Sequence, residues 1–395
     1  MKQKNLKRLL AALALPLAFA SLSPAAYAAA PAPAAATAIS AELKAEENTP
    51  LTIAEQGSFA VGGSTKEKGG TFSSERFLEP TGQTAYGDHA YVFYQKPLHP
   101  QKYPLVFEHG GAQTKRTWES TPDGREGFQN IFLREGFSTY LVDQPRIGEA
   151  GLALAADDGR NPYAANPMYA DRTMFMLCRV GTYAGDQPKV FAGSAFPNTP
   201  EAINQFQRTW TPYTGQLDDD VSADAIAALL EKTGPAILVT HSMGGTVGWR
   251  TPLRTENVKA IVAFEPGGSP FLFPEGEVPE AETPVYAPVS ATAKAVPLAD
   301  FEKLTKVPMI LFYGDYIPDH PVEEVGPDKW RSELDMAKKF VAAVNRHGGD
   351  ATLVHLPEIG IKGNTHFLMA DKNNLDIAAL MEEWLKAKGL MDSNE

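Results

Sequence analysis

The stretch that decides the fold is Pro235–Gly245, which reads P-A-I-L-V-T-H-S-M-G-G. Its first part, Ala236–Val239, is a short apolar run typical of strands that are buried on both faces of a sheet. The run leads into a tight turn with Ser242 at its apex, and the glycines after it allow a helix, expected over Val247–Leu253, to pass close behind. This strand–turn–helix order is that of a nucleophile elbow, which exposes the serine hydroxyl above the sheet. Thr240 replaces the first glycine of the usual G-x-S-x-G pattern, so a serine that merely caps the helix is the alternative.

Before and after this turn, apolar runs that predict strands alternate along the chain with amphipathic stretches that predict helices. The alternation predicts an α/β fold on a mostly parallel, doubly wound sheet. Two leading strands, Leu51–Val61 and Ala90–Lys96, are expected to pair antiparallel. The other expected strands are Pro104–Glu108, Thr139–Asp143, Val258–Phe264, Val307–Tyr313 and Ala351–Leu356. The other expected helices are Gly124–Gly136, Lys329–His347 and Leu375–Lys388, and a Pro/Glu-rich loop is expected over Ser269–Ala299.

Residues 145–220 interrupt this rhythm and contain no clear strand. An insertion at this point of the fold would lie over the carboxyl ends of the parallel strands as a helical cap. Its aromatic and methionine side chains either form the apolar roof of a pocket or pack into the core. They are Tyr163, Met168, Tyr169, Met174, Phe175, Met176, Phe206 and Trp210.

The amino-terminal residues 1–28 have the pattern of a secretory leader. A basic segment precedes the apolar stretch Leu9–Leu22, and Ala26-Tyr27-Ala28 fits the cleavage rule. Residues 29–48 are rich in alanine and proline and predict a flexible linker, which leaves 49–395 as the domain. No later stretch is apolar over 18 residues, so we expect an exported protein, periplasmic or secreted, with no membrane span in the mature chain.

Composition narrows the possible partners. Hydrophobic residues make up 43% of the chain, which is typical of a globular protein. The leader holds four of the 36 basic residues and none of the 48 acidic ones, so the remainder carries a formal charge of −16. Such a charge argues against nucleic acid and anionic membranes as partners. Cys178 is the one cysteine, which excludes an intrachain disulfide and a cysteine-rich metal site, and we expect its thiol to be buried.

Three chemically capable side chains follow the ends of expected strands in the order serine, acid, histidine. This is the chain order of α/β-hydrolases, in which a histidine activates the serine and a carboxylate orients the histidine. His366 is the expected base because it lies on a loop after the last strand. Two carboxylates, Glu265 and Asp315, end neighbouring strands, and spacing alone leaves the choice between them open.

The turn His109-Gly110-Gly111 follows the strand Pro104–Glu108. An H-G-G turn at this position is typical of esterases, in which it supplies one N–H donor to the oxyanion. The second donor is expected to be the N–H of Met243, the residue after the serine. A glycine turn without a catalytic role is the alternative.

From about residue 104 to the end, apart from the expected cap and the loop Ser269–Ala299, the sequence resembles a small group of exported bacterial esterases within the α/β-hydrolase superfamily. Members of this group use glutamate as the triad acid and carry a disulfide between consecutive cysteines beside the oxyanion hole. The matching stretches are His109-Gly110, Thr117–Phe128 (T-W-E-S-T-P-D-G-R-E-G-F), Phe132–Gln144, T-H-S-M-G-G around the serine, Ile261–Gly267 and Gly363–Leu375.

The resemblance implies a catalytic triad of Ser242, His366 and Glu265, and oxyanion donors at Gly111 and Met243. It further implies ester hydrolysis through an acyl-enzyme and a homodimer. Expected pocket residues are His109, Trp118 and His241, and the expected substrate is a small to medium, apolar or aromatic ester. No cofactor or metal is expected, because no metal-ligand spacing is visible.

Two features depart from the group. Gly111 and Ala112 stand where the consecutive cysteines would be, and the loop Ser269–Ala299 is longer. The rival hypotheses are amide hydrolysis or perhydrolysis by the same triad, and a binding protein that has lost catalytic activity.

Overall fold

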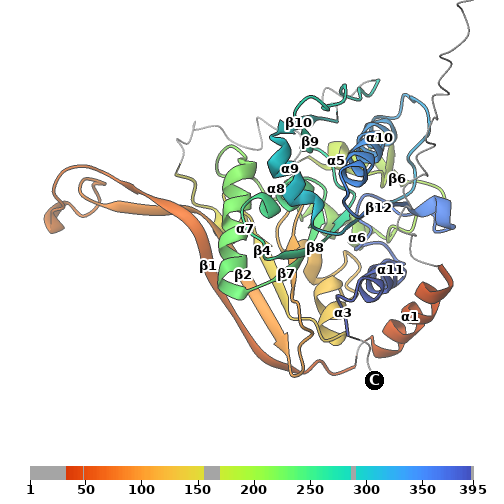
Figure 1. The fold of residues 1–395 in the computed structure, drawn as a ribbon, viewed down its shortest axis with the longest axis horizontal. Coiled ribbons are helices and arrows are strands. Elements are labelled where there is room, and N and C mark those ends of the chain that lie inside the picture. Colours follow the sequence, from red (N-terminus) through yellow and green to blue (C-terminus); the bar gives the residue numbers. More distant parts are fainter. Residues whose placement is uncertain (1–32, 48, 155–169, 286–290, 393–395) are drawn as a thin grey trace, which may run out of the picture.

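The computed structural model describes residues 33–47, 49–154, 170–285 and 291–392, so the expected leader lies outside the described residues. Its centre is an eight-stranded sheet in the order β1-β2-β4-β3-β7-β8-β11-β12 (Figure 1). β2 pairs antiparallel with both β1 and β4, and the remaining neighbours are parallel. The prediction of an α/β fold on a mostly parallel sheet is therefore confirmed. The strands are β1 (Ile53–Glu67), β2 (Thr84–Pro97), β3 (Leu105–Glu108), β4 (Thr139–Asp143), β7 (Ala236–His241), β8 (Val258–Phe264), β11 (Met309–Tyr313) and β12 (Ala351–His355).

Helices cover both faces of the sheet and enclose two hydrophobic cores. The first core holds buried side chains of α7, α8, α9 and α10, and the second holds those of α1, α3 and α11. These helices are α1 (Pro33–Glu46), α3 (Phe128–Arg134), α7 (Asp219–Thr233), α8 (Gly244–Arg250), α9 (Leu298–Thr305), α10 (Val325–Arg346) and α11 (Asn374–Ala387).

The strand β7 shows why short apolar runs form the central strands. Leu238 contributes to the first core, whereas Ile237 and Val239 contribute to the second. Successive side chains of a strand point to opposite faces, so a strand covered on both sides must be apolar throughout. All six residues of β7 are buried.

The segment 145–220, called the cap segment below, lies between β4 and α7 in the chain. Its described elements are η2 (Gly148–Ala150), α5 (Asp171–Leu177), α6 (Pro200–Gln207) and an antiparallel hairpin of β5 (Gly181–Ala184) and β6 (Gln187–Val190). The expectation that it contains no strand is wrong, because this hairpin forms a two-stranded sheet. Met174, Phe175 and Phe206 are buried in the second core, and Tyr163, Met168 and Tyr169 lie outside the described residues.

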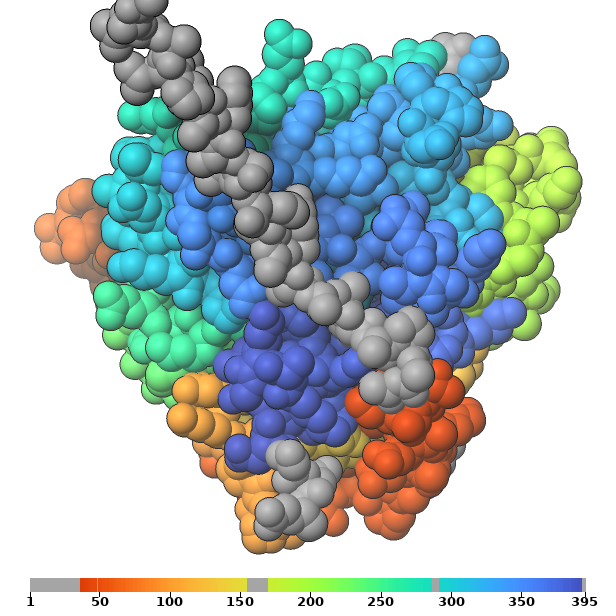
Figure 2. Space-filling model, turned by 45° about the vertical axis from the view of Figure 1, so that its right-hand side comes forward, coloured from red at the N-terminus to blue at the C-terminus, as the bar shows by residue number. Residues whose placement is uncertain are grey.

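The expected flexible linker, residues 29–48, also differs from the structure. Its described part forms α1, which packs along α11 near the carboxyl terminus (Figure 2). Ala36 and Leu43 are each 5% exposed, and Ser40 Oγ donates to Asp376 Oδ1 at 2.5 Å. Alanine has the highest helix propensity, so an alanine-rich stretch becomes helical once a neighbouring helix buries one face.

The expected loop Ser269–Ala299 contains regular structure as well. β9 (Phe271–Pro274) and β10 (Ala293–Val296) form a parallel two-stranded sheet, and Phe271 and Phe273 belong to the first core. Residues 286–290 of this loop lie outside the described part.

The hairpin of β1 and β2 extends well beyond the body of the molecule (Figure 1). Its distal part includes η1 (Ser74–Arg76) and exposes Phe72, Phe77, Leu78 and Tyr86. Among the described residues, no helix combines the length and the apolar character that a membrane span requires.

Candidate active site

The serine turn between β7 and α8 has a strained backbone. Ser242 has a φ of 53°, in the left-handed region that non-glycine residues rarely occupy. A Cβ on Gly244 would lie 2.7 Å from the carbonyl oxygen of His109, so glycine is required where α8 begins close to the loop after β3. The Ser242 N–H donates to Phe264 O at 3.0 Å, which ties the turn to β8.

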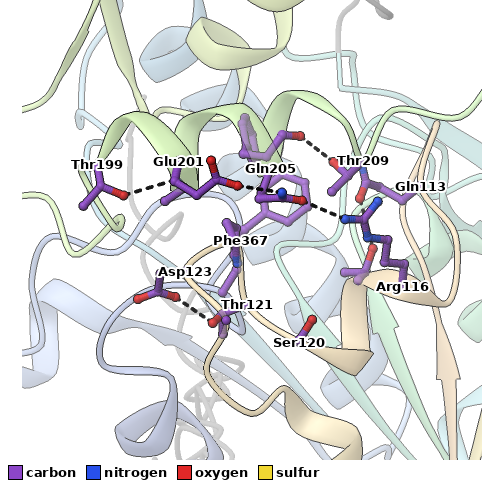
Figure 3. Close-up of a pocket in the computed structure, with 16 residues that line it drawn as sticks. Gln113, Arg116, Ser120, Thr121, Asp123, Thr199, Glu201, Gln205, Thr209 and Phe367 are labelled. Carbon is purple, nitrogen blue, oxygen red and sulfur yellow. Dashed lines mark hydrogen bonds between the residues drawn. The ribbon is translucent and has the colours of Figure 1, made fainter.

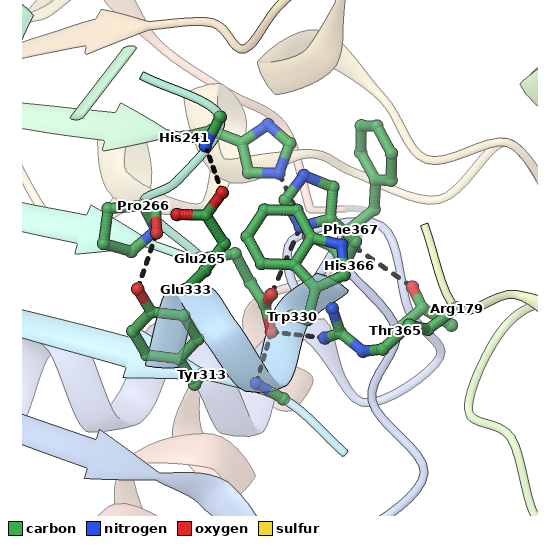
Figure 4. Close-up of polar contacts among 12 residues, drawn as sticks. Arg179, His241, Glu265, Pro266, Tyr313, Trp330, Glu333, Thr365, His366 and Phe367 are labelled. Atoms are coloured by element: carbon green, nitrogen blue, oxygen red, sulfur yellow. Dashed lines mark hydrogen bonds and ion pairs between the residues drawn. The ribbon is translucent and has the colours of Figure 1, made fainter. Parts of the chain in front are cut away.

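His366 and Glu265 meet in the buried region beside this turn (Figure 4). His366 Nδ1 lies 3.2 Å from Glu265 Oε2, and the two residues are 4% and 0% exposed. A carboxylate accepts, so Nδ1 carries the proton and Nε2 is left as the acceptor. Glu265 has a φ of 50°, so the acid and the serine are both held in strained conformations.

Asp315, the alternative acid, makes different contacts. Its Oδ2 accepts the N–H of Gly363 at 2.7 Å, and its Oδ1 accepts that of Tyr316 at 2.7 Å. The side chain therefore anchors the start of the loop that carries His366. Glu265 is the carboxylate of the two that contacts the histidine.

The cap segment contributes an arginine that the sequence analysis did not select. Arg179 is fully buried, and its Nη2 lies 2.6 Å from Glu265 Oε1. Its Nε donates to the carbonyl oxygen of Asp315 at 2.8 Å. The only sequence signal is an arginine beside a cysteine, 86 positions from the acid, so no motif reveals the pair.

Aromatic rings enclose His366 on two sides. The ring centroid of Trp330 lies 4.0 Å from that of His366, and the centroid of His241 lies 4.5 Å away. Burial lowers the pKa of His366 well below its usual range, and the positive charges of Arg179 and Lys329 lower it further. The imidazole is therefore neutral near pH 7, the state required of a base.

The loop after β3 contacts the serine turn directly. A Cβ on Gly110 would lie 2.8 Å from Ser242 Cβ, and one on Gly111 would lie 2.3 Å from Met243 Sδ. Ala112, which follows, has a φ of 56°. A side chain at Gly110 would therefore collide with the serine turn, whereas one at Gly111 would require the flexible Met243 side chain to move.

His109, Trp118 and His241 do not line an open pocket, which corrects the expectation for these residues. All three are at most 1% exposed. His109 Nδ1 donates to Gly110 O at 2.8 Å and its Nε2 accepts the Gln144 N–H at 3.2 Å, so the ring braces the loop after β3. His241 Nε2 donates to His366 O at 3.0 Å, whereas Trp118 packs against core phenylalanines.

A buried carboxyl lies beneath this loop. Glu108, the last residue of β3, is fully buried, and its Oε2 accepts from Gln144 Nε2 at 3.0 Å. Its Oε1 has no hydrogen-bond partner among the described residues. Burial raises the pKa of Glu108 to about 8, so the carboxyl is mostly protonated at pH 7.

Comparison with known proteins agrees with this arrangement of strands and turns. Residues 105–392 match the model of the family described as "Alpha/beta hydrolase family". The chain belongs to the α/β-hydrolase family.

Two relatives of this α/β-hydrolase are informative. It is 30% identical over 320 residues to the fungal protein named "Probable secreted lipase phiG" (Fungal sp., strain ATCC 74256), covering 75% of this chain and 85% of the relative. It is 28% identical to a structure described as a novel bacterial esterase, with a TM-score of 0.67, covering 86% of this chain and 97% of that one.

The α/β-hydrolase also has a cleft of about 500 Å³ next to the histidine loop (Figure 3). Its wall includes α6, α2 (Arg116–Glu119) and Phe367, whose ring contacts both His366 and His241. Polar side chains bridge it: Arg116 Nη2 donates to Gln205 Oε1 at 3.1 Å. Ser242 is not among the residues that line this cleft. Within the described part of the chain, no three His, Cys, Asp or Glu side chains are grouped so as to hold a metal ion.

Proposed function

We propose that this α/β-hydrolase is a serine carboxylic ester hydrolase with a triad of Ser242, His366 and Glu265. The buried contact between His366 Nδ1 and Glu265 Oε2, beside the strained serine turn, is the observation that carries the proposal. A serine hydroxyl is a poor nucleophile at neutral pH and needs a base that a carboxylate holds in the correct tautomer.

The proposed reaction proceeds through an acyl-enzyme. Ser242 Oγ attacks the ester carbonyl carbon while His366 Nε2 takes the hydroxyl proton. His366 then gives this proton to the leaving alcohol as the C–O bond breaks. Water attacks the acyl-enzyme in the same way, releases the acid and restores the serine. The negative charge of Glu265 stabilises the imidazolium that forms in each half.

The proposed oxyanion donors are the backbone N–H groups of Gly111 and Met243. The closeness of the loop after β3 to the residue after the serine supports this assignment, since a Cβ on Gly111 would lie 2.3 Å from Met243 Sδ. One oxyanion donor is worth about 3–4 kcal/mol of activation free energy in comparable enzymes.

The relatives support an ester as the substrate. One is named a secreted lipase and the other is described as an esterase. We propose a small to medium ester with an apolar or aromatic part. The name of the first relative also supports export, and we propose that the leader directs this chain to the periplasm or the medium. A homodimer, implied by the resemblance, is tested by light scattering.

The first test is hydrolysis of p-nitrophenyl esters with acyl chains of two to twelve carbons. Wild type should be active and Ser242→Ala inactive, and a fluorophosphonate should label only wild type. Ser222→Ala, at a buried serine of α7, is the matched control and should keep full activity. Equal activity of wild type and Ser242→Ala would contradict the proposal.

The rival uses of the site are tested beside it. Amide cleavage or perhydrolysis faster than ester hydrolysis would reassign the reaction but keep the triad. A folded wild type that neither hydrolyses esters nor reacts with the fluorophosphonate would instead indicate a binding protein.

A further inference from the structure

Three consecutive residues of the cap segment contact the proposed base, the proposed acid and the ring that lies against the base. The carbonyl oxygen of Leu177 accepts from Trp330 Nε1 at 2.7 Å, and the ring of Trp330 lies tilted against that of His366. The carbonyl oxygen of Cys178 accepts the backbone N–H of His366 at 3.0 Å. The side chain of Arg179 binds Glu265. The segment Leu177–Arg179 thus contacts the base, the ring that covers the base, and the acid.

Arg179 makes the most direct of these contacts. Glu265 Oε1 accepts from Arg179 Nη2 and from the backbone N–H of Gly314, which leaves Oε2 facing His366 (Figure 4). The guanidinium is fixed in turn, because its Nε donates to Asp315 O and its Cζ lies 5.3 Å from the centroid of Trp330. The planar fork of arginine holds its N–H groups in the fixed directions of this double contact, whereas a lysine carries its donors on one flexible nitrogen.

Because the ion pair between Arg179 and Glu265 is buried, the loss of one partner strongly destabilises the charge of the other. Arg179 and Glu265 are both 0% exposed, and a buried carboxylate without a partner is strongly disfavoured. Without the guanidinium, the carboxylate would lose the positive charge that balances its own, and Oε1 would keep the N–H of Gly314 as its one donor among the described residues. Turning of the carboxyl group would then impair the contact of Oε2 with His366.

We propose that Arg179 is a positioning residue of the triad, through which the cap segment holds Glu265 in the orientation that serves His366. This inference rests on the proposed function. It implies that the cap segment supports the catalytic residues directly.

The first variant to test is Arg179→Met. A misplacement of about 1 Å in a catalytic constellation costs about 10²-fold, so kcat should fall about 10²-fold while KM changes little. Arg146→Met is the matched control. Arg146 is also in the cap segment, has a φ of 72°, and forms a buried ion pair with Asp88, with Nε 2.8 Å from Oδ1. It should lose stability but keep kcat.

The pH profile separates positioning from simple stabilisation. Removing the positive charge of Arg179 raises the pKa of His366, so the acidic limb of kcat/KM should move to higher pH in Arg179→Met. In Arg146→Met, the acidic limb of the pH profile of kcat/KM should stay at its wild-type position. The single substitutions of Arg179 and Arg146 leave the other charged or titratable groups around His366 unchanged. These are Glu265, His241, Lys329 with its partner Glu333, and Asp371 behind Thr365.

Arg179→Lys covers the case in which Arg179→Met does not fold. It keeps the charge but replaces the rigid fork that spans Glu265 and Asp315 O with one flexible nitrogen, so it should lower kcat while leaving the acidic limb of the pH profile near its wild-type position.

A double-variant cycle with Glu265→Gln completes the test. If Arg179 acts through Glu265, the Arg179→Met/Glu265→Gln protein should be no slower than Glu265→Gln alone. The inference would be overturned if the fold-losses in kcat of the two single variants multiplied in the double variant. It would also be overturned if the Arg179 variants matched Arg146→Met in kcat and in pH profile. Because wild-type hydrolysis and fluorophosphonate labelling are measured alongside, failure of the proposed function itself would show separately as an inactive wild type.

Discussion

The two carboxylates that end neighbouring strands show how a residue's role depends on partners that are distant in the sequence. Glu265 faces His366 on one oxygen and Arg179 on the other. The carboxylate oxygens of Asp315 accept hydrogen bonds from backbone N–H groups of its own turn and of the loop that carries His366. Their spacing in the sequence leaves the choice open, whereas the resemblance favours Glu265 and the structure shows that Glu265 is the one that contacts His366.

This difference predicts the outcome of paired substitutions. Glu265→Gln should lower kcat about 10⁴-fold, as the loss of a triad carboxylate does elsewhere, because the amide cannot stabilise the imidazolium. Asp315→Asn should cost much less, since an amide oxygen can still accept from Gly363. Ester hydrolysis measured on both variants checks the order, and a larger loss in Asp315→Asn would make Asp315 the acid.

Glu108 predicts a pH dependence of stability. Its pKa in the folded protein, about 8, lies above the value of about 4.5 in an unfolded chain. The folded state therefore binds more protons than the unfolded one between these pH values, and stability falls as pH rises through that window. Glu108→Gln should keep the contact with Gln144 and remove this loss.

Urea denaturation of wild type and Glu108→Gln at pH 5 and pH 8.5 measures the effect. The variant should gain free energy of unfolding relative to wild type at pH 8.5 and little at pH 5. A difference that is the same at both pH values would mean that Glu108 ionises normally.

At the residue scale, the sequence could predict the residues that belong to motifs. Ser242 stands in the strained turn after β7, and His366 lies on a loop after the last strand, where its ring contacts Glu265. Arg179 belongs to no motif, because its role depends on the folding of the cap segment against β8. His109 and Trp118 were expected at the pocket, but a motif cannot tell whether a side chain lines a cavity or supports its wall.

At the scale of elements, hydrophobic periodicity predicted the strands of the central sheet and a helix that packs on it. The expected strand Val258–Phe264 matches β8, and the expected helix Leu375–Lys388 nearly matches α11. The hairpin of β5 and β6 was missed because its eight residues include proline, lysine, glutamine and glycine, which have low strand propensity. α1 was missed because alanine and proline also dominate linkers, and only packing on α11 distinguishes the two.

The packing of α1 predicts that it contributes to stability. Leu43→Ala removes a nearly buried side chain and should lower the free energy of unfolding by about 2–3 kcal/mol. Lys44→Ala, at the adjacent exposed position with a surface ion pair to Glu47, should change it by less than about 1 kcal/mol. Chemical denaturation measures both, and equal stability of Leu43→Ala and wild type would restore the interpretation as a flexible linker.

At the scale of the whole molecule, the leader predicts the form of the protein outside the cell. The exported chain should begin at Ala29, after the small-residue cleavage site. Intact-mass analysis of protein from the periplasm and from the medium determines both the cleavage point and the location. Full-length chain confined to the cytoplasm would contradict export.

The burial of Cys178 makes the reactivity of its thiol a native measure of local opening in the segment Leu177–Arg179. It is the one cysteine of the chain, it is 2% exposed, and it lies between the two residues that contact Trp330 and Glu265. Burial also raises the pKa of its thiol, so the closed form presents almost no reactive thiolate. A thiol reagent can modify it only during transient local unfolding. The rate at which the reagent modifies Cys178 therefore measures how often the segment Leu177–Arg179 opens locally and loses its contacts with Glu265, His366 and Trp330. The measurement needs no introduced label.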